Sequence, residues 1–236
     1  MQRLPEHPPG DVLEIACGTG LVTRRLRAHV RPSLRLVATD LSKTMLDYAR
    51  AKLDNRSDIA WREADALKLP FEDNRFGAVV CGFGMMFVPD RQAALKEARR
   101  VLIEGGMLLF SVWDRVEENP HALAYAEVIE TMFPGDPEMR FRLPYDMHDP
   151  SLLRRLLAGA RFRETRIETK RIAIEGADPR IIATGQIRGT PRSALIEKRG
   201  VALDLVIGKV TDALARTGGN PYRGHAQAVI VQALAI

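Results

Sequence analysis

Short apolar runs alternate with segments of helical periodicity over residues 11–113 of the chain. This alternation is typical of parallel strands joined by crossover helices. The apolar runs are rich in aliphatic side chains, as strands in a sheet covered on both faces require. They predict five strands, at Val12–Ala16, Leu34–Thr39, Ile59–Glu63, Phe76–Cys81 and Met107–Trp113.

Three helices are predicted between these strands. Leu21–Val30 forms the first, and Ser42–Leu53 forms the second, with Ser42 as its N-cap and an apolar stripe along one face. A third helix is expected to start from the N-cap Asp90 and to end at Gly105-Gly106, because glycine commonly terminates helices.

The regular alternation loosens after Trp113. The chain then continues with two further predicted helices, separated by a proline-rich stretch, and with two alternating strands that flank a mostly helical segment. In chain order these are a helix near Pro120–Met132, the stretch Pro134–Pro150, a helix at Ser151–Gly159, a strand at Arg166–Glu175, the helical residues 178–216 and a strand at Ala226–Ala235.

The charge is distributed unevenly along the chain. Residues 1–150 carry 20 Lys/Arg against 23 Asp/Glu, whereas residues 151–236 carry 15 against 7. A basic C-terminal part could meet an acidic substrate, a nucleic acid or an anionic membrane surface. A solvated surface is the favoured interpretation, because no aromatic residues interleave with the arginines as they do where bases stack. Binding of nucleic acid is therefore not expected.

Several features of the sequence are typical of a protein of the reducing cytoplasm. No apolar run approaches the roughly 18 residues that span a bilayer, and the N-terminus lacks the apolar stretch of a signal peptide. Cys17 and Cys81 cannot form a framework of bridges, and neither has the spacing of a metal ligand. We therefore expect a cytoplasmic protein with two reduced thiols and no metal site.

The strongest chemical signal is Glu14-Ile15-Ala16-Cys17-Gly18-Thr19-Gly20, at the end of the first predicted strand and the start of the first helix. Where a parallel strand turns tightly into a helix, glycines let the backbone approach a ligand. The free N–H groups of the helix favour a carboxylate or a phosphate there. The pattern predicts a ligand site at this turn.

Two acidic residues sharpen that prediction. Asp40 ends the second strand about 20 residues beyond the glycine turn, where a carboxylate can accept hydrogen bonds from ribose hydroxyls. Thr23 stands where a dinucleotide fingerprint has its third glycine, which argues against NAD. Asp65, directly after the third strand, could accept a hydrogen bond from an exocyclic amine. The structural alternative is that Asp65 caps a turn.

These residues give the chain a resemblance to the class I S-adenosylmethionine-dependent methyltransferases, and in particular to the small-molecule branch with the ubiquinone and menaquinone biosynthesis enzymes. Besides the glycine turn, it rests on five motifs within residues 11–113. They are Val37-Ala38-Thr39-Asp40-Leu41-Ser42 with Met45-Leu46, Ala64-Asp65-Ala66, Leu69-Pro70-Phe71, Asp73-Asn74-Arg75-Phe76-Gly77-Ala78-Val79-Val80, and Glu97-Ala98-Arg99-Arg100-Val101-Leu102 with Gly105-Gly106.

The resemblance implies an α/β fold: a Rossmann-like, mostly parallel sheet of seven strands, with helices on both faces and an antiparallel last strand. We expect residues 1–236 to form a single methyltransferase domain. Its parts would be a cofactor-binding core at 11–113, a substrate-side insertion at 115–161, and C-terminal strands with a helical insertion at 162–236.

The resemblance also implies a site for S-adenosylmethionine, with S-adenosylhomocysteine as the product. Glu14 and the turn Ala16-Cys17-Gly18-Thr19-Gly20 would hold the methionine portion. Asp40 would bind the ribose, and Asp65 the adenine amine. Leu41 and Met45 would lie beside the adenine, and Ala66 would lie next to Asp65. The residues around the methyl group would be Cys81, Gly82, Phe83 and Met86.

Three features depart from the family pattern. Ala16 stands where many relatives have glycine, which is tolerated if its φ is negative. Ile103-Glu104 replaces the common Lys-Pro before Gly105-Gly106. Only eleven residues precede the first strand, whereas relatives carry an N-terminal helical cover; either the chain starts late or residues 115–160 supply the cover.

The acceptor stays open at the level of sequence. Trp113, Phe133, Phe141 and Tyr145 offer aromatic surface for a small, partly hydrophobic molecule, or they are ordinary core. His148 is the best-placed candidate base, although a lone loop histidine is more often structural. The alternatives are an RNA or protein methyltransferase that uses the basic C-terminal part, and a cofactor-binding protein without activity. The sequence is compatible with an oligomer.

Overall fold

The computed structural model describes residues 3–53, 58–140, 142–190 and 192–236. It divides into two compact units. Unit 1 comprises Met1–Val112, Met147–Thr169 and Val229–Ile236, and unit 2 comprises Trp113–Asp146 and Lys170–Ala228. Two long strands pass from one unit into the other. The expectation of a single domain stays a prediction.

A seven-stranded sheet, in the order β3-β2-β1-β4-β5-β7-β6, organises the fold. The first five strands pair in parallel, and β7 runs antiparallel between β5 and β6, so the predicted fold class is confirmed. The bounds are β1 Val12–Glu14, β2 Leu36–Asp40, β3 Ile59–Glu63, β4 Phe76–Gly82, β5 Leu102–Trp113, β6 Phe162–Ala177 and β7 Tyr222–Ala235.

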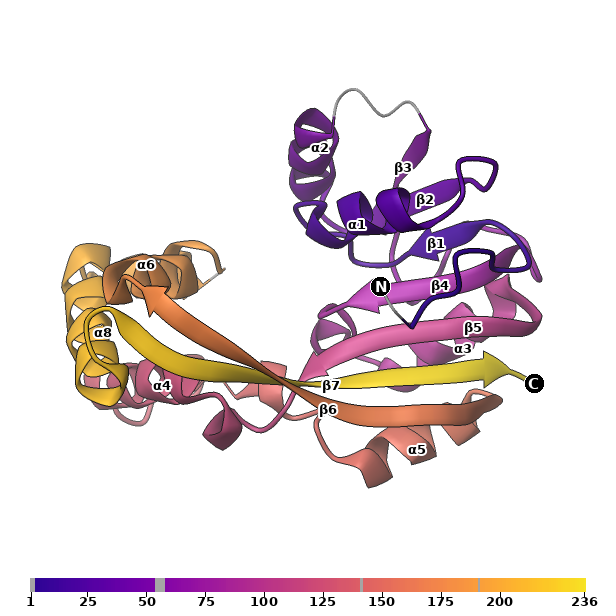
Figure 1. The fold of residues 1–236 in the computed structure, drawn as a ribbon. Helices are drawn as coiled ribbons and strands as arrows, with labels where there is room; N and C mark the ends of the chain where they lie inside the picture. Colours follow the sequence, from indigo (N-terminus) through magenta and orange to yellow (C-terminus); the bar gives the residue numbers. More distant parts are fainter. Residues whose placement is uncertain (1–2, 54–57, 141, 191) are drawn as a thin grey trace. The chain divides into compact units, whose positions relative to one another are not determined.

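Four helices of unit 1 belong to this sheet (Figure 1): α1 Leu21–His29, α2 Lys43–Lys52, α3 Arg91–Val101 and α5 Pro150–Gly159. α1 and α2 contact β2, whereas α3 contacts α5. This separation follows from right-handed crossovers, because the strand order reverses direction between β3 and β4. The predicted caps are present, with Ser42 accepting from the N–H of Met45 and Asp90 from that of Ala93.

The prediction that Gly105-Gly106 ends the third helix is wrong. α3 ends at Val101, and β5 begins at the next residue, so both glycines lie inside the strand. They accommodate an irregularity there: Phe76 and Ala78 of β4 face Leu102 and Met107 of β5, and Gly105 takes the left-handed φ of 70°. The glycines therefore serve a bulged strand rather than a helix end.

Arg100 joins three of the sequence motifs in unit 1. Its guanidinium donates to Glu97 and Asp73 and to the backbone carbonyls of Leu69 and Phe71. Glu97 in turn accepts from the N–H of Leu69. The motifs that surround these residues are thus a structural brace that holds the segment before β4 against α3.

Unit 2 is a helical cluster at one end of β6 and β7. Its helices are α4 Pro120–Met132, α6 Pro179–Arg188, α7 Arg192–Lys198 and α8 Leu203–Gly218, of which α4, α6 and α8 contact one another (Figure 1). Short 3-10 turns lie at Val116–Glu118 and Leu143–Tyr145, and a third, Met85–Phe87, lies in unit 1. The core is apolar, with Val206, Ile207 and Val210 of α8 fully covered. The helices predicted at 120–132 and within 178–216 are confirmed.

β6 and β7 extend beyond their predicted ranges. β7 starts at Tyr222, four residues before the predicted start, because the Tyr222 side chain is completely buried in the core of unit 2. Within the described part of the chain, no helix has the length and apolar character needed to cross a bilayer.

Candidate functional site

The turn after β1 is built from left-handed backbone positions. Ala16, Gly18 and Gly20 have φ values of 54°, 54° and 80°. Glycine adopts this region without cost, but alanine does so only with strain of roughly 1–2 kcal/mol. The condition of a negative φ, under which alanine is tolerated at position 16, is therefore not met. The turn leaves β1 two residues earlier than predicted and then leads into α1.

Gly84 belongs to this turn, although its role was not predicted. A Cβ added to Gly84 would collide with the Cβ of Ala16 and lie 2.9 Å from Cys81 Sγ. A glycine after β4 is therefore needed where the chain passes the turn. The signal for it, a glycine three residues after a buried cysteine, is too common to have been recognised in the sequence.

Asp40 contacts the turn directly. Its Oδ2 accepts from the N–H of Gly18 at 2.8 Å, and its Oδ1 accepts from the N–H of Ser42 at 2.8 Å. Thr39, which sequence reasoning also missed, donates its hydroxyl to the carbonyl of Glu14 at 2.8 Å. The carboxyl ends of β1 and β2 are thus locked together, with the Asp40 carboxylate at the turn.

Asp65 lies beside the same edge but is engaged in its own turn. Glu63 pairs with Asp40, and the N–H of Ala64 donates to the Asp40 carbonyl, so the chain after β3 passes close to β2. The Oδ1 of Asp65 accepts from the N–H of Leu67 at 2.9 Å. Asp65 therefore caps a turn, as the structural alternative predicted. Its second carboxylate oxygen, Oδ2, takes no part in that turn, and Ala66 lies within the turn.

Glu14 is the deepest charged residue at this edge. Its side chain is 1% exposed, and among the described residues its Oε2 has no hydrogen-bond partner. Burial raises the pKa of the Glu14 carboxyl to about 7; the Thr23 hydroxyl opposes this shift and the charge of Asp40 adds to it. A buried carboxylate oxygen without a partner costs free energy unless a ligand donates a hydrogen bond to it.

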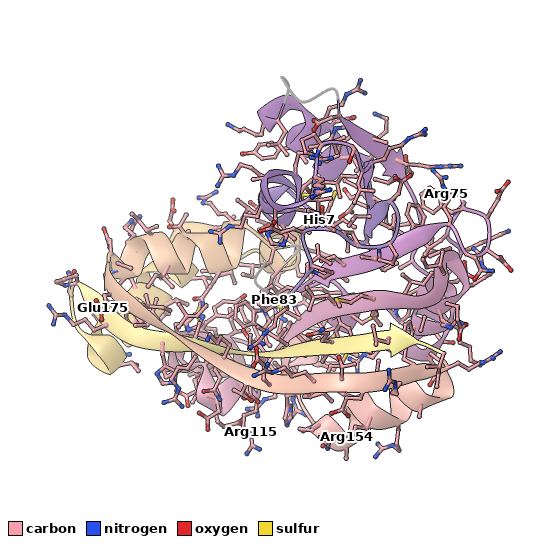
Figure 2. The ribbon with its side chains drawn as sticks, turned by 45° about the vertical axis from the view of Figure 1, so that its right-hand side comes forward. His7, Arg75, Phe83, Arg115, Arg154 and Glu175 are labelled. Carbon is pink, nitrogen blue, oxygen red and sulfur yellow. The ribbon has the colours of Figure 1, made fainter. Side chains whose placement is uncertain are left out.

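The end of β4 supplies an apolar wall (Figure 2). Arg75 precedes the strand and Phe83 follows it, so the two labelled side chains mark its opposite ends. Cys81 and Met86 are buried, whereas Gly82 and Phe83 are partly open. Burial raises the pKa of the Cys81 thiol to about 12 and burial also raises that of Cys17, so both stay protonated at neutral pH.

Two predicted contacts are exposed apolar side chains. Leu41, directly after Asp40, is 69% exposed, and Met45 in the first turn of α2 is 42% exposed. Apolar side chains in this position flank the carboxylate of Asp40 with surface that a flat aromatic ligand would cover.

The remaining candidates lie elsewhere. His148 is half-buried and directly precedes Asp149, the N-cap of α5. Trp113, Phe133 and Tyr145 belong to unit 2, and Phe141 lies outside the described residues. Phe133 packs against the core of α4, α6 and α8 and also borders a cavity of about 230 Å³, and a role of this residue in binding the acceptor stays a prediction.

Comparisons with known proteins agree with this arrangement. Residues 13–110 match the family model described as "Methyltransferase domain". The chain is 43% identical over 107 residues to demethylmenaquinone methyltransferase of Staphylococcus carnosus (strain TM300), a stretch that covers 45% of this chain and 44% of that protein. It is 41% identical over 97 residues to the enzyme of the same name from Staphylococcus aureus (strain JH9), covering 41% and 40%. The match thus spans less than half the length of these relatives.

Solved structures resemble most of the chain. One is a putative methyltransferase from Bacillus halodurans, with a TM-score of 0.61, 19% identity, and coverage of 95% of this chain and 91% of that one. Another is a phosphoethanolamine N-methyltransferase from Haemonchus contortus in complex with S-adenosylhomocysteine, with a TM-score of 0.58, 16% identity, and coverage of 96% and 48%. These likenesses establish the fold. Residues 13–110 thus resemble the methyltransferase-domain family, and the solved structures share the fold of the chain.

Proposed function

We propose that the chain binds S-adenosylmethionine at the carboxyl edge of its parallel strands and transfers the methyl group to a small, partly hydrophobic acceptor. One observation carries the proposal. A buried carboxylate oxygen without a partner, on Glu14, stands at a glycine turn whose N–H is already bound to the Asp40 carboxylate. A ligand that brings a cation and hydroxyl donors to this edge satisfies both acidic residues.

The residues fit the proposed cofactor part by part. Glu14 accepts from the α-ammonium of the methionine portion, and the turn at Gly18 leaves room for the chain of that portion. Asp40, still able to accept through its remaining lone pairs, binds the ribose. Oδ2 of Asp65 takes the adenine amine, with Ala66 beside it, and Leu41 and Met45 cover the adenine face.

S-adenosylmethionine supplies, when bound, a methyl group made reactive by its sulfonium. The residues of the chain then have to orient the two reactants and exclude water, and such alignment can supply roughly 7–11 kcal/mol. Cys81, Gly82, Phe83 and Met86 form the dry wall for this task. His148 remains a candidate base for acceptors that must lose a proton, and a cytoplasmic location remains a prediction.

The first test is calorimetric titration of the whole chain with S-adenosylhomocysteine. Asp40→Ala should weaken binding by about 10- to 100-fold, because it removes charge-assisted hydrogen bonds. Asp47→Ala is the matched control, since Asp47 is exposed on α2 and only pairs with Lys43. Equal affinities in wild type and Asp40→Ala would reject the site.

The second test is a screen with labelled methyl donor. Demethylmenaquinone is included because the relatives are named for it, and RNA and protein fractions represent the other acceptor classes. Transfer to a small hydrophobic molecule supports the proposal. Transfer to RNA, with affinity that falls steeply with salt, would favour the alternative based on the basic C-terminal part. Cofactor binding without transfer to any acceptor would favour the inactive alternative.

A further inference from the structure

β6 is an edge strand of the sheet. It pairs with β7 on one side, and among the described residues the strand order places no strand on its other side. The backbone N–H and C=O groups along such an edge are available to a further strand. In unit 2, the successive residues 170–173 of β6 are exposed, so both faces of the strand are open beside this edge.

Two isoleucines lie on one face of β6 in unit 2. Ile172 and Ile174 are two positions apart, and successive side chains of a strand point to opposite faces, so these two share a face. Ile174 packs against the core of unit 2, whereas Ile172 is 63% exposed. The edge therefore carries a large apolar side chain next to a half-buried one.

The opposite face of β6 carries two charges of opposite sign. Arg171 and Glu175 lie there, on either side of the exposed Ala173. Arg171 donates to Gln227 at 2.8 Å and to Glu118 at 2.9 Å, and its guanidinium has more N–H donors than these two bonds use. It can thus accept a further acidic partner.

Glu175 differs from other acidic residues of β6. In unit 1, Glu164 accepts from Arg154 at 2.8 Å, and Glu168 accepts from Arg3 at 2.9 Å. The Glu175 side chain has no hydrogen bond or ion pair among the described residues. One acidic side chain of the strand is therefore left for a partner outside the chain.

The surface beside Glu175 is open. Glu175, which is labelled in Figure 2, is exposed and borders a cavity of about 400 Å³. The other residues that line this cavity come from β6 and β7 and are Ile174, Gly176, Arg223 and Gly224. An approaching strand therefore meets no helix at this end of β6.

The order of these residues is complementary to itself when two copies of β6 run antiparallel. A two-fold axis at Ala173 places Arg171 of each copy opposite Glu175 of the other, and Ile172 opposite Ile174. Opposite charges and β-branched side chains in directly opposed positions both stabilise strand pairs, and the symmetry produces each pair twice. A shift of the register by two residues loses both charge pairs.

Charged residues on an edge also serve to prevent pairing, because like charges repel. In the two-fold register, however, Lys170 lies opposite Gly176, and Arg171 lies opposite an acidic residue. No like charges are opposed between residues 170 and 176. The charges of this segment therefore select one register instead of blocking every register.

We propose that residues 170–176 of β6 pair antiparallel with the same residues of a second copy of the chain, about a two-fold axis at Ala173. The inference goes beyond the proposed function, does not depend on methyl transfer, and concerns unit 2 alone. A single pair of strands is a small interface, so we expect a dimer whose population rises with protein concentration.

Sedimentation velocity of the whole chain over a series of concentrations is the first test. Glu175→Arg should weaken the dimer by about tenfold or more, because two attractive pairs become two repulsive ones. Folding should be kept, since Glu175 is exposed. Glu127→Arg is the matched control, with the same change of charge at an exposed position of α4 in unit 2. A wild type that stays monomeric at every concentration, or a Glu175→Arg dimer as stable as that of wild type, would overturn the inference.

Cross-linking tests the register. Directly opposed Cα atoms lie about 4.5–5.5 Å apart, within the range of a disulfide, whereas diagonal ones lie roughly 7–8 Å apart, beyond it. Mild oxidation should therefore link two copies of Ala173→Cys but not two copies of Ile172→Cys, as read on a non-reducing gel. The native Cys17 and Cys81 are buried and should not interfere. A covalent dimer of Ile172→Cys, or none of Ala173→Cys, would reject pairing about Ala173.

Discussion

Replacing Glu14 by glutamine should change stability and ligand affinity in opposite directions. Burial raises the pKa of the Glu14 carboxyl from an ordinary value near 4.3 to about 7. The difference means that the ionised form is disfavoured in the folded chain by about 3.5 kcal/mol. The side chain is 1% exposed, so solvent offers little screening of this cost.

The sign of the pH dependence follows from proton binding. Below about pH 4.3 the carboxyl is protonated in both the folded and the unfolded chain. Between about pH 4.3 and pH 7 the unfolded chain has lost the proton while the folded chain retains it, so over this range the free energy of unfolding falls by up to about 3.5 kcal/mol and then levels off. Glutamine cannot ionise, and Glu14→Gln should therefore be more stable than wild type at pH 8 and nearly equal to it at pH 4.

Binding should follow the opposite course. If the ionised carboxylate receives the α-ammonium of the ligand, affinity follows the ionised fraction of Glu14, which rises about 16-fold between pH 5.5 and pH 7.0. Calorimetry with S-adenosylhomocysteine measures this in wild type, and Glu14→Gln should show weaker binding with no such rise. Urea denaturation at pH 4 and pH 8 measures stability, with Glu72→Gln, an exposed position of unit 1, as control. A variant that loses stability at pH 8, or that retains the rise in affinity, refutes the reasoning.

Three further changes test the structure around the site. Ala16→Gly should raise the free energy of unfolding by roughly 0.5–1 kcal/mol in urea, because relief of the left-handed strain exceeds the entropy cost of glycine; a decrease would contradict the strain. Arg100→Met should lower it by about 2–3 kcal/mol, since four acceptors lose their donor, whereas the exposed Arg24→Met should have little effect; equal values would dismiss the brace. Asp90→Ala should lower it by about 1 kcal/mol through loss of the N-cap, and an unchanged urea midpoint would argue against that cap.

The parallel half of the fold was predictable because its signals are local. Aliphatic runs predict the strands, and helical periodicity predicts the helices. The side chains of Ser42 and Asp90 mark where two helices begin, because they are typical N-cap residues. The proximity of Gly18 and Asp40 followed from the rule that ligands meet the carboxyl edge of such sheets. These features need no knowledge of distant residues.

The errors arose where a distant partner decides the local structure. Gly105-Gly106 has the form of a helix stop, but pairing of β5 with β4 extends the strand back to Leu102. Ala16 takes a left-handed conformation because the hydrogen bonds of Ile15 to Val80 and of Cys17 to Thr39 fix the chain on either side of it. Local propensity cannot report constraints that come from partners 22 positions away, as Thr39 is from Cys17, or 65 positions away, as Val80 is from Ile15.

The distribution of unpaired polar atoms links stability to the proposed chemistry. Arg27, buried in unit 1, donates to the carbonyls of Leu34, Val30 and Arg31, and Asn119 is similarly satisfied in unit 2. Among the described residues, the atoms without partners in unit 1 belong to Glu14 and its neighbour Thr23, at the proposed cofactor turn. Arg27 shows that a deeply buried charge in unit 1 can be fully paired, so the open carboxylate oxygen of Glu14 is a destabilising feature that the proposed ligand would offset. A neutral replacement at Glu14 should accordingly stabilise unit 1 at pH 8 while it weakens binding, as expected where stability is given up for function.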